Sequence, residues 1–265
     1  EIAAFRAKGG IFFSDEVLFG SALSKVLNTT LPVEENISLL PVDISKIRGI
    51  INKTSDGYLA PNEVQQLLDA VGIGRVREKV VDSQAQALET AKEMGFPLVM
   101  KVVGPVHKSD VGGVTLHVND LTTVQNEFTR MMQIRDTTSV LMQSQLTGTQ
   151  LFVGAKREEL FGHTIVCGFG GIFVEVFKDI SYGLSPLSQQ EAINMIRSLQ
   201  CYPMIKGIRG QKGVNEEMFV QTIQRVSALC QAAPEIAEMD INPLLGTSKH
   251  VTAVDARIRI EKKIN

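Results

Sequence analysis

The sequence predicts an α/β (α+β) fold built from sandwich-like subdomains, and three observations support this. Apolar runs of strand length, such as 139–145, are interspersed with segments of helical period, such as 83–94. These strands and helices do not alternate in strict βαβ order, which disfavours a single doubly wound sheet. The chain has 265 residues, of which 44% are hydrophobic, so it is large enough to bury a substantial core.

Composition argues against several classes of protein. The net charge of −2 gives no electrostatic reason to bind nucleic acid or an anionic membrane. No apolar run approaches the roughly 20 residues of a membrane span, and the N-terminus does not resemble a secretory signal. It also lacks an initiator Met, so we interpret the chain as a piece of a longer protein or a trimmed one. Cys167, Cys201 and Cys230 fit neither a disulfide framework nor a zinc site, and they suit the reducing cytoplasm.

An N-terminal segment, 1–52, is expected to precede the main domain. The elements expected in it are a helix at 2–7, a strand at 11–13, a helix capped by Ser14-Asp15 that ends near Leu27, a linker at 28–41 and a helix at 43–52. One strand and one helix without further partners cannot close a core.

The main domain, 53–265, carries stronger signals, because glycine ends two of its helices at Gly72 and Gly95 and Asn215 caps the longest one. The expected helices are 64–71, 83–94, 120–132, 189–199 and 216–232. The expected strands are 77–81, 97–103, 114–118, 139–145, 150–155, 164–168, 172–177, 236–241 and 251–254.

The most specific stretch is a predicted hairpin with a polar tip. Lys101 interrupts an apolar strand and is expected to point into a cleft. After Pro105 comes a loop that holds His107 and Lys108, and Gly112-Gly113 then leads into the next strand. Backbone N–H groups at the glycines and the two lysines would give positive potential for phosphates. On residues alone, a surface hairpin with a solvated charged tip is an equally good interpretation.

A second constellation lies on the strand that contains Glu238, Asp240 and Asn242. Residues two apart share one face of a strand, so these three oxygen-bearing side chains point the same way. Asp255 follows after a turn, and an antiparallel pairing would bring Asn242 and Asp255 side by side. Carboxylate and amide oxygens are ligands suited to Mg²⁺ shared with nucleotide phosphates. The alternative is a polar strand face directed toward water.

These motifs resemble, in order, those of the NDP-forming acyl-CoA synthetases, the ADP-forming acetyl-CoA synthetase family. The segments that carry the resemblance are His107–Val114, Gly154–Arg157, Gly168–Asp179 and Asp240–Asn242 with Asp255. They lie within about residues 57–258. The resemblance is to the ATP-grasp part of those enzymes, which is related to the nucleotide-binding subunit of succinyl-CoA synthetase. It implies an ATP-grasp fold of two α/β subdomains, preceded by a remnant of the preceding ligase-type domain.

The resemblance also implies roles for single residues. His107 would be a mobile phosphoryl carrier with Asp240 as its partner, and Asn242 and Asp255 would hold Mg²⁺. Val140, Leu141 and Met142 would form an apolar slot for adenine, with backbone hydrogen bonds to the base. For Arg157, contact with phosphate and a plain solvated side chain are equally open.

The implied activity is reversible phosphoryl transfer between ATP or ADP and a phosphohistidine. It would be one half of the reaction of acyl-CoA, ADP and phosphate to acid, CoA and ATP. The CoA-binding half would be fused upstream or be a separate subunit, and we expect an oligomer in the full assembly. A regulatory nucleotide-binding module, as in some protein lysine acetyltransferases, and a scaffold subunit are the alternatives.

Two positions depart from the family pattern. Gln150 stands where the family usually has an acid, and Gly183 where it commonly has an arginine. The other histidines, His117, His163 and His250, have no carboxylate at metal-ligand spacing, and we interpret each as structural or exposed.

Overall fold

The computed structural model describes residues 2–27, 37–105, 110–170, 179–208, 210 and 212–262. The chain divides into two compact units, Glu1–Asn36 and Ile37–Asn265.

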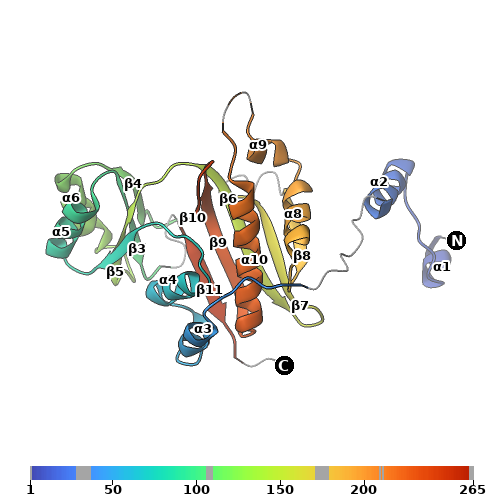
Figure 1. Cartoon of the computed structure of the whole chain (residues 1–265), viewed down its shortest axis with the longest axis horizontal. Coiled ribbons are helices and arrows are strands. Elements are labelled where there is room, and N and C mark those ends of the chain that lie inside the picture. Colours follow the sequence, from blue (N-terminus) through green and yellow to red (C-terminus); the bar gives the residue numbers. More distant parts are fainter. Residues whose placement is uncertain are drawn as a thin grey trace. The chain divides into compact units, whose positions relative to one another are not determined.

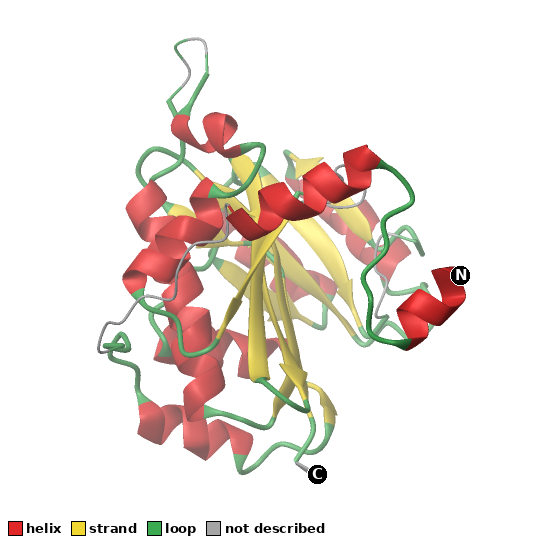
Figure 2. Cartoon of the chain, turned by 90° about the vertical axis from the view of Figure 1, so that its right-hand side faces the viewer, coloured by secondary structure: helices red, strands yellow, loops and turns green. Residues whose placement is uncertain are grey.

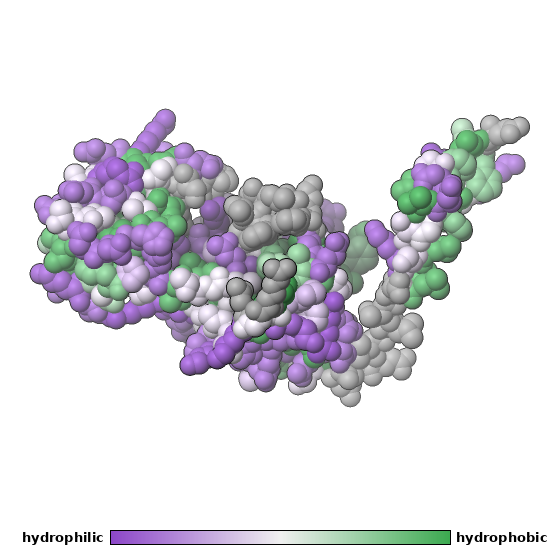
Figure 3. All heavy atoms as spheres, turned by 90° about the horizontal axis from the view of Figure 1, so that it is seen from above, coloured by the Kyte–Doolittle hydropathy of each residue, from purple (hydrophilic) through white to green (hydrophobic). Residues whose placement is uncertain are grey.

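The N-terminal unit contains helices α1 (Ile2–Ala7) and α2 (Glu16–Leu27). The Asp15 carboxylate accepts a hydrogen bond from the Leu18 N–H at 2.8 Å, which is the cap predicted for α2. The strand expected at 11–13 is wrong, because a strand needs a paired neighbour and residues 2–27 offer none. Apolar side chains such as Ile11 and Leu27 are about four-fifths exposed, and helix surfaces of this unit are green in Figure 3.

The second unit begins with the small lobe, at the left of Figure 1. Four of its described strands form a sheet in the order β2-β5-β3-β4. Their bounds are β2 Glu78–Val81, β5 Ser139–Ser144, β3 Leu98–Val103 and β4 Val114–Val118. Helices α5 (Gln84–Met94) and α6 (Leu121–Met131) cover one face of it, and the lobe's core lies between. Caps on Ser83 and Asp120 fix where these helices begin.

The predicted hairpin is confirmed as the antiparallel pair β3 and β4. Lys101 lies opposite Val114, and the Val102 N–H donates to the Gly113 carbonyl at 2.8 Å. Gly112 has φ +66°, a conformation that glycine adopts without strain. The hairpin therefore has a defined base at both strand ends.

The large lobe is built on a sheet of seven described strands. Six follow the order β1-β11-β9-β6-β7-β8, and β10 pairs with β9. The strands are β1 Gly57–Tyr58, β6 Thr149–Glu158, β7 Gly162–Phe169, β8 Ile180–Leu184, β9 Ile236–Gly246, β10 Val251–Ala253 and β11 Ala256–Ile260. The helices are α3 Ile44–Ile51, α4 Pro61–Ala70, α8 Gln189–Arg197, α9 Tyr202–Lys206 and α10 Glu216–Ala232.

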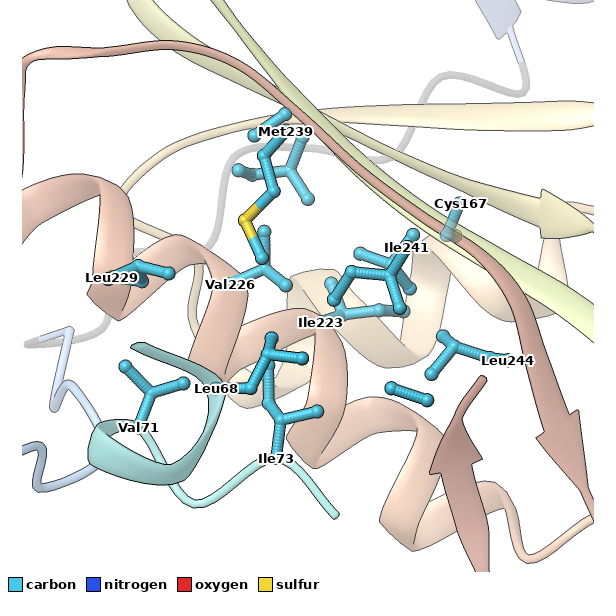
Figure 4. Packing of buried hydrophobic residues seen from close by; sticks show 14 of the residues in the cluster. Leu68, Val71, Ile73, Cys167, Ile223, Val226, Leu229, Met239, Ile241 and Leu244 are labelled. Atoms are coloured by element: carbon cyan, nitrogen blue, oxygen red, sulfur yellow. The ribbon is translucent and has the colours of Figure 1, made fainter. Parts of the chain in front are cut away.

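The core of this lobe forms between the sheet and α10. Figure 2 shows helices gathered on one side of the strands, and Figure 4 shows Ile223 and Val226 of α10 directed toward Met239 and Ile241 of β9. All four are at most 2% exposed. Burying each side chain of this kind stabilises the fold by about 1.5–3 kcal/mol relative to leaving it exposed. Helix α10 therefore holds β9 in place through the face that carries Met239 and Ile241.

Several boundaries differ from those expected. Helix α3, placed by the sequence in the N-terminal segment, packs Ile47 and Ile51 into the core of the second unit. Strands β1, β8 and β11 and helix α9 were not expected, and β11 rather than 251–254 is the last core strand. The strand predicted at 172–177 lies outside the described residues. Within the described part of the chain, no helix has both the length and the apolar character to cross a bilayer.

Candidate active site

The two lobes enclose a cavity of about 980 Å³. The small lobe contributes Lys101 from β3, and the large lobe contributes Asp240 and Asn242 from β9 and Asp255 from the turn before β11. The segment 144–148, which connects the lobes, lines it as well. The volume suits a small-molecule ligand of nucleotide size.

The polar face predicted for β9 is present. Met239 and Ile241 are buried in the core, whereas Asp240 and Asn242 on the opposite face line the cavity. Strand alternation separates the two sets, and the packing of α10 decides which set faces inward.

Asn242 and Asp255 lie side by side, as the sequence predicted. The Asn242 N–H donates to the Asp255 carbonyl at 3.0 Å, directly beyond the pairing of Ile241 with Ala256. Close packing behind Asn242 requires a glycine, because a Cβ on Gly170 would lie 3.1 Å from Asn242 Oδ1 and would collide with the Leu151 carbonyl. An amide oxygen and a carboxylate are thus held at one edge of the cavity. These are donors that fit Mg²⁺ bound jointly with phosphate.

Burial raises the pKa of Asp240, and it is the largest influence on this group. The Arg257 charge, opposite Asp240 across the β9–β11 pairing, acts to lower the pKa, and the Asp255 and Glu238 carboxylates raise it further. Crowded carboxylates of this kind favour a cationic ligand or partner at the site.

Lys101 points from its strand into the cleft, as predicted. It is only 7% exposed, and its Nζ donates to the Val254 carbonyl at 3.3 Å. Met100 and Val102, its neighbours on β3, face the small-lobe core. The ammonium group is therefore held at the cavity wall, next to the residue that precedes Asp255.

Gln143 is a site residue that the sequence analysis missed. Its side chain is fully buried and lines the cavity. Its Nε2 donates to Glu78 Oε2 and to the Val254 carbonyl, both at 2.7 Å. Burial raises the pKa of Glu78, while the hydrogen bond from Gln143 and the charge of Lys101 act to lower it. A polar residue directly after Val140-Leu141-Met142 was the signal that could have revealed it.

The expected adenine slot requires correction. Val140 and Met142 are buried in the small-lobe core, because strand alternation turns them toward α5 and α6. Only Leu141 faces a cavity, a smaller one of about 170 Å³ that Val103 and Pro105 also line. Strand β5 pairs with β2 on one side and β3 on the other, so its backbone groups serve the sheet.

The prediction for Arg157 also requires correction, because its side chain neither lines the cavity nor is simply solvated. Its guanidinium donates to the carbonyls of Pro234 and Glu261 at 3.1 and 3.0 Å, and to the Glu261 carboxylate at 3.2 Å. It is seven residues along β6 from Gln150, which lines the cavity, and that is a distance of about 23 Å at about 3.3 Å per residue. Its role is to fasten the end of the sheet.

The other predicted residues belong to the hairpin and its surroundings. The Gly112 carbonyl accepts from Arg130 Nη1 at 2.9 Å and, with Gly113, defines the hairpin base. His107 and its neighbours Val106, Lys108 and Ser109 lie outside the described residues.

Comparison with known proteins agrees with this geometry. The sequence model of the ATP-grasp domain family matches residues 51–260. The chain is 35% identical over 227 residues to the acetate–CoA ligase [ADP-forming] I subunit beta of Pyrococcus furiosus, which covers 81% of this chain and 98% of that subunit. The chain belongs to the ADP-forming acyl-CoA synthetase family. It is an ATP-grasp, beta-type part of such a ligase.

Other members show how the parts are joined. The acetate–CoA ligase [ADP-forming] I of Archaeoglobus fulgidus is 35% identical over 244 residues, but the chain spans only 35% of that protein. A structure of acetyl-coenzyme A synthetase 1 from Ca. Korarchaeum cryptofilum has a TM-score of 0.72 and 32% identity, over 81% of this chain and all of that one. That structure holds coenzyme A and Mg-AMPPCP, and its phosphohistidine segment points towards the nucleotide binding site. None of these relatives is a regulatory module.

The two departures from this family's pattern have different surroundings. Gln150 lines the cavity, so the missing acid lowers the negative charge there. Gly183 is enclosed, because a Cβ on it would lie 2.7 Å from both Leu187 Cδ2 and Met195 Sδ. An arginine at 183 would therefore have to displace the core beneath β8.

The remaining histidines of this family member are structural or exposed, as predicted. The ring of His163 is buried, with Nε2 donating to the Ile236 carbonyl at 2.7 Å. His117 Nδ1 pairs with Gln145 Nε2 at 2.8 Å, and His250 is exposed.

Proposed function

We propose that this chain carries out the nucleotide half-reaction of an ADP-forming acyl-CoA synthetase, moving a phosphoryl group between ATP and His107. The observation that carries the proposal is the single cavity in which Lys101, Asp240, Asn242 and Asp255 meet. A buried cation, two metal-type oxygen donors and an extra carboxylate are the groups that phosphoryl transfer needs around a nucleotide.

In the direction of ATP synthesis, a β-phosphate oxygen of ADP attacks phosphohistidine. A P–O bond forms, the P–N bond breaks, and neutral imidazole leaves. Lys101 holds the phosphates at the cavity wall and offsets their charge. Asp240 orients the imidazole of His107 and stabilises its positive form when the ring is phosphorylated.

The donor set also supports a divalent cation. Asn242 and Asp255 would hold Mg²⁺ together with the phosphates, and the ion would neutralise charge on the transferred group.

Acyl-group chemistry is assigned to a CoA-binding half, either fused or separate, because this chain matches a whole beta subunit in one relative and about a third of a larger ligase in another. The acyl phosphate would form on that half and phosphorylate the histidine. ADP and ATP would then be exchanged on this chain.

Exchange of label between ADP and ATP tests the proposal without the other half. Incubated with Mg²⁺, ATP and radiolabelled ADP, the chain should move label into ATP, because phosphohistidine formation releases an ADP that can be replaced. The His107→Ala variant is the matched control and should show no exchange. Nucleotide binding without any exchange by the unchanged chain would contradict the proposal.

A further inference from the structure

Within the described part of the chain, one buried polar atom in the cavity wall has no hydrogen-bond partner. Gln143 is 0% exposed, and among the described residues its Oε1 accepts no hydrogen bond. Buried acceptors are rarely left in this state, because losing water without a replacement partner is unfavourable. Since Gln143 lines the cavity, a bound ligand that carries an N–H group could satisfy the atom.

The amide cannot turn over to offer its nitrogen instead. Nε2 has two hydrogens, and both are directed at acceptors, the Glu78 carboxylate and the Val254 carbonyl, each at 2.7 Å. A rotation of 180° would set Oε1 against these two oxygens. The backbone carbonyl has no proton to donate, so the free group remains an acceptor.

The cavity that Gln143 lines also offers apolar surface for the base of a nucleotide. Val99 lies directly opposite Gln143 on β3. Apolar side chains share this cavity, namely Val99, Leu116, Leu146 and Leu245. The charged groups that suit phosphate and metal are Asp240 on the facing strand β9, Asp255, and Lys101, whose ammonium group donates to the same Val254 carbonyl as Gln143. A planar base between the apolar side chains would place its edge toward Gln143.

We propose that Gln143, fixed in orientation by Glu78 and Val254, makes this site select adenine over guanine nucleotides. Resting on the proposed function, this inference adds the identity of the base. The 6-amino group of adenine donates to Oε1, whereas the 6-oxo group of guanine is a second acceptor. With guanine, both oxygens would be buried without a donor between them.

Calorimetric titration with three diphosphates tests the inference on the unchanged chain. ADP, GDP and purine riboside 5′-diphosphate would each be titrated in the presence of Mg²⁺. The last compound keeps the purine ring nitrogens of ADP but lacks the amino group. ADP should bind roughly ten- to a hundredfold more tightly than either of the others.

Two variants separate the orientation of Gln143 from its mere presence. Gln143→Met removes the acceptor. Glu78→Gln replaces one of the two pure acceptors with a side chain that can also donate, which weakens the preference for one orientation while the Val254 carbonyl still opposes a turned amide. Gln143→Met should bring the ratio of ADP to GDP affinity close to one, and Glu78→Gln should lower the ratio by less. Gln133→Met, at an exposed glutamine after α6, should leave the ratio unchanged.

The outcomes distinguish failure of the adenine selectivity from failure of the proposed function. ADP binding with an ADP-to-GDP ratio near one or below would overturn the inference and leave the proposed function standing. Loss of affinity for 2′-deoxy-ADP, with purine riboside diphosphate binding as well as ADP, would assign Gln143 to the ribose and also overturn it. Binding of no nucleotide would overturn both. If Gln143→Met fails to fold, the ratios on the unchanged chain still decide.

Discussion

Lys101 interrupts an otherwise apolar strand, and its side chain is almost fully buried at the cavity wall. Replacing it by Met keeps the stem and removes the charge. Because a hydrogen bond to a charged group contributes about 1–3 kcal/mol, ATP affinity should fall roughly 5- to 150-fold. Calorimetry would measure this, with exposed Lys156→Met as the matched control. Equal affinity of Lys101→Met and the parent chain would show that the ammonium group does not contact phosphate.

Asp255 offers the second prediction for a single residue. If it holds Mg²⁺, Asp255→Ala should lose the gain in nucleotide affinity that Mg²⁺ gives, about tenfold or more, while circular dichroism shows an intact fold. Glu238→Ala is the control, since Glu238 lies on the same strand but is exposed. An unchanged dependence of nucleotide binding on Mg²⁺ in Asp255→Ala would refute the metal assignment.

Some residues of the site could be predicted from the sequence alone, and others could not. Lys101, Asn242 and Asp255 could be placed because a charge in an apolar strand and a two-residue period have direct geometric consequences. Gln143 could not be placed, since its importance depends on Glu78 across the strand pair and on Val254 of the other lobe. Arg157 was misjudged because its partner, Glu261, is more than 100 residues away.

At the scale of elements, a buried histidine ties the start of β7 to the start of β9. His163 donates to the Ile236 carbonyl, and burial lowers the pKa of its ring below the ordinary 6.5. The unfolded chain therefore takes up a proton near pH 6.5, whereas the folded chain resists it until lower pH. The contribution of the neutral His163 ring to the free energy of unfolding should therefore be complete above pH 6.5. It should decrease as the pH drops below that value.

Urea unfolding at pH 7.5 and 5.5 checks this prediction. His163→Phe should lose about 1–3 kcal/mol at pH 7.5 through the unpaired carbonyl, but should then lose less than the parent chain between the two pH values. His250→Phe, at an exposed histidine, should keep the parent's dependence on pH. If all three chains lose the same free energy on acidification, His163 does not contribute to it.

The helices and strands that could be predicted are those whose own residues carry caps or a clear apolar pattern. Helices α5 and α10 have caps and an apolar stripe, and β3 and β5 are continuous apolar runs. Strand β8 exposes Tyr182 and Leu184 and contains Gly183, so it lacks a strand pattern. Its place in the sheet depends on pairing with β7, which its own residues do not predict.

At the scale of the whole second unit, the two lobes meet at the Val254 carbonyl. Lys101 and Gln143 of the small lobe both donate to it, and Asp255 is the next residue. The small lobe therefore holds the residue next to the proposed metal ligand. The sequence could indicate both halves of the site, but the volume between them depends on how the lobes pack.

Acid-labile labelling is the most direct test of His107 as the carrier of the phosphoryl group. With Mg²⁺ and ATP labelled at the γ-phosphate, or with acyl-CoA, labelled phosphate and the CoA-binding half, the chain should acquire a label that acid removes. Phosphoramidates are acid-labile and phosphoserine is not, so the chemistry also separates His107 from Ser109. His107→Ala should abolish the label while still binding nucleotide. Label that persists in His107→Ala, or that maps to His117, His163 or His250, would show that His107 is not the carrier.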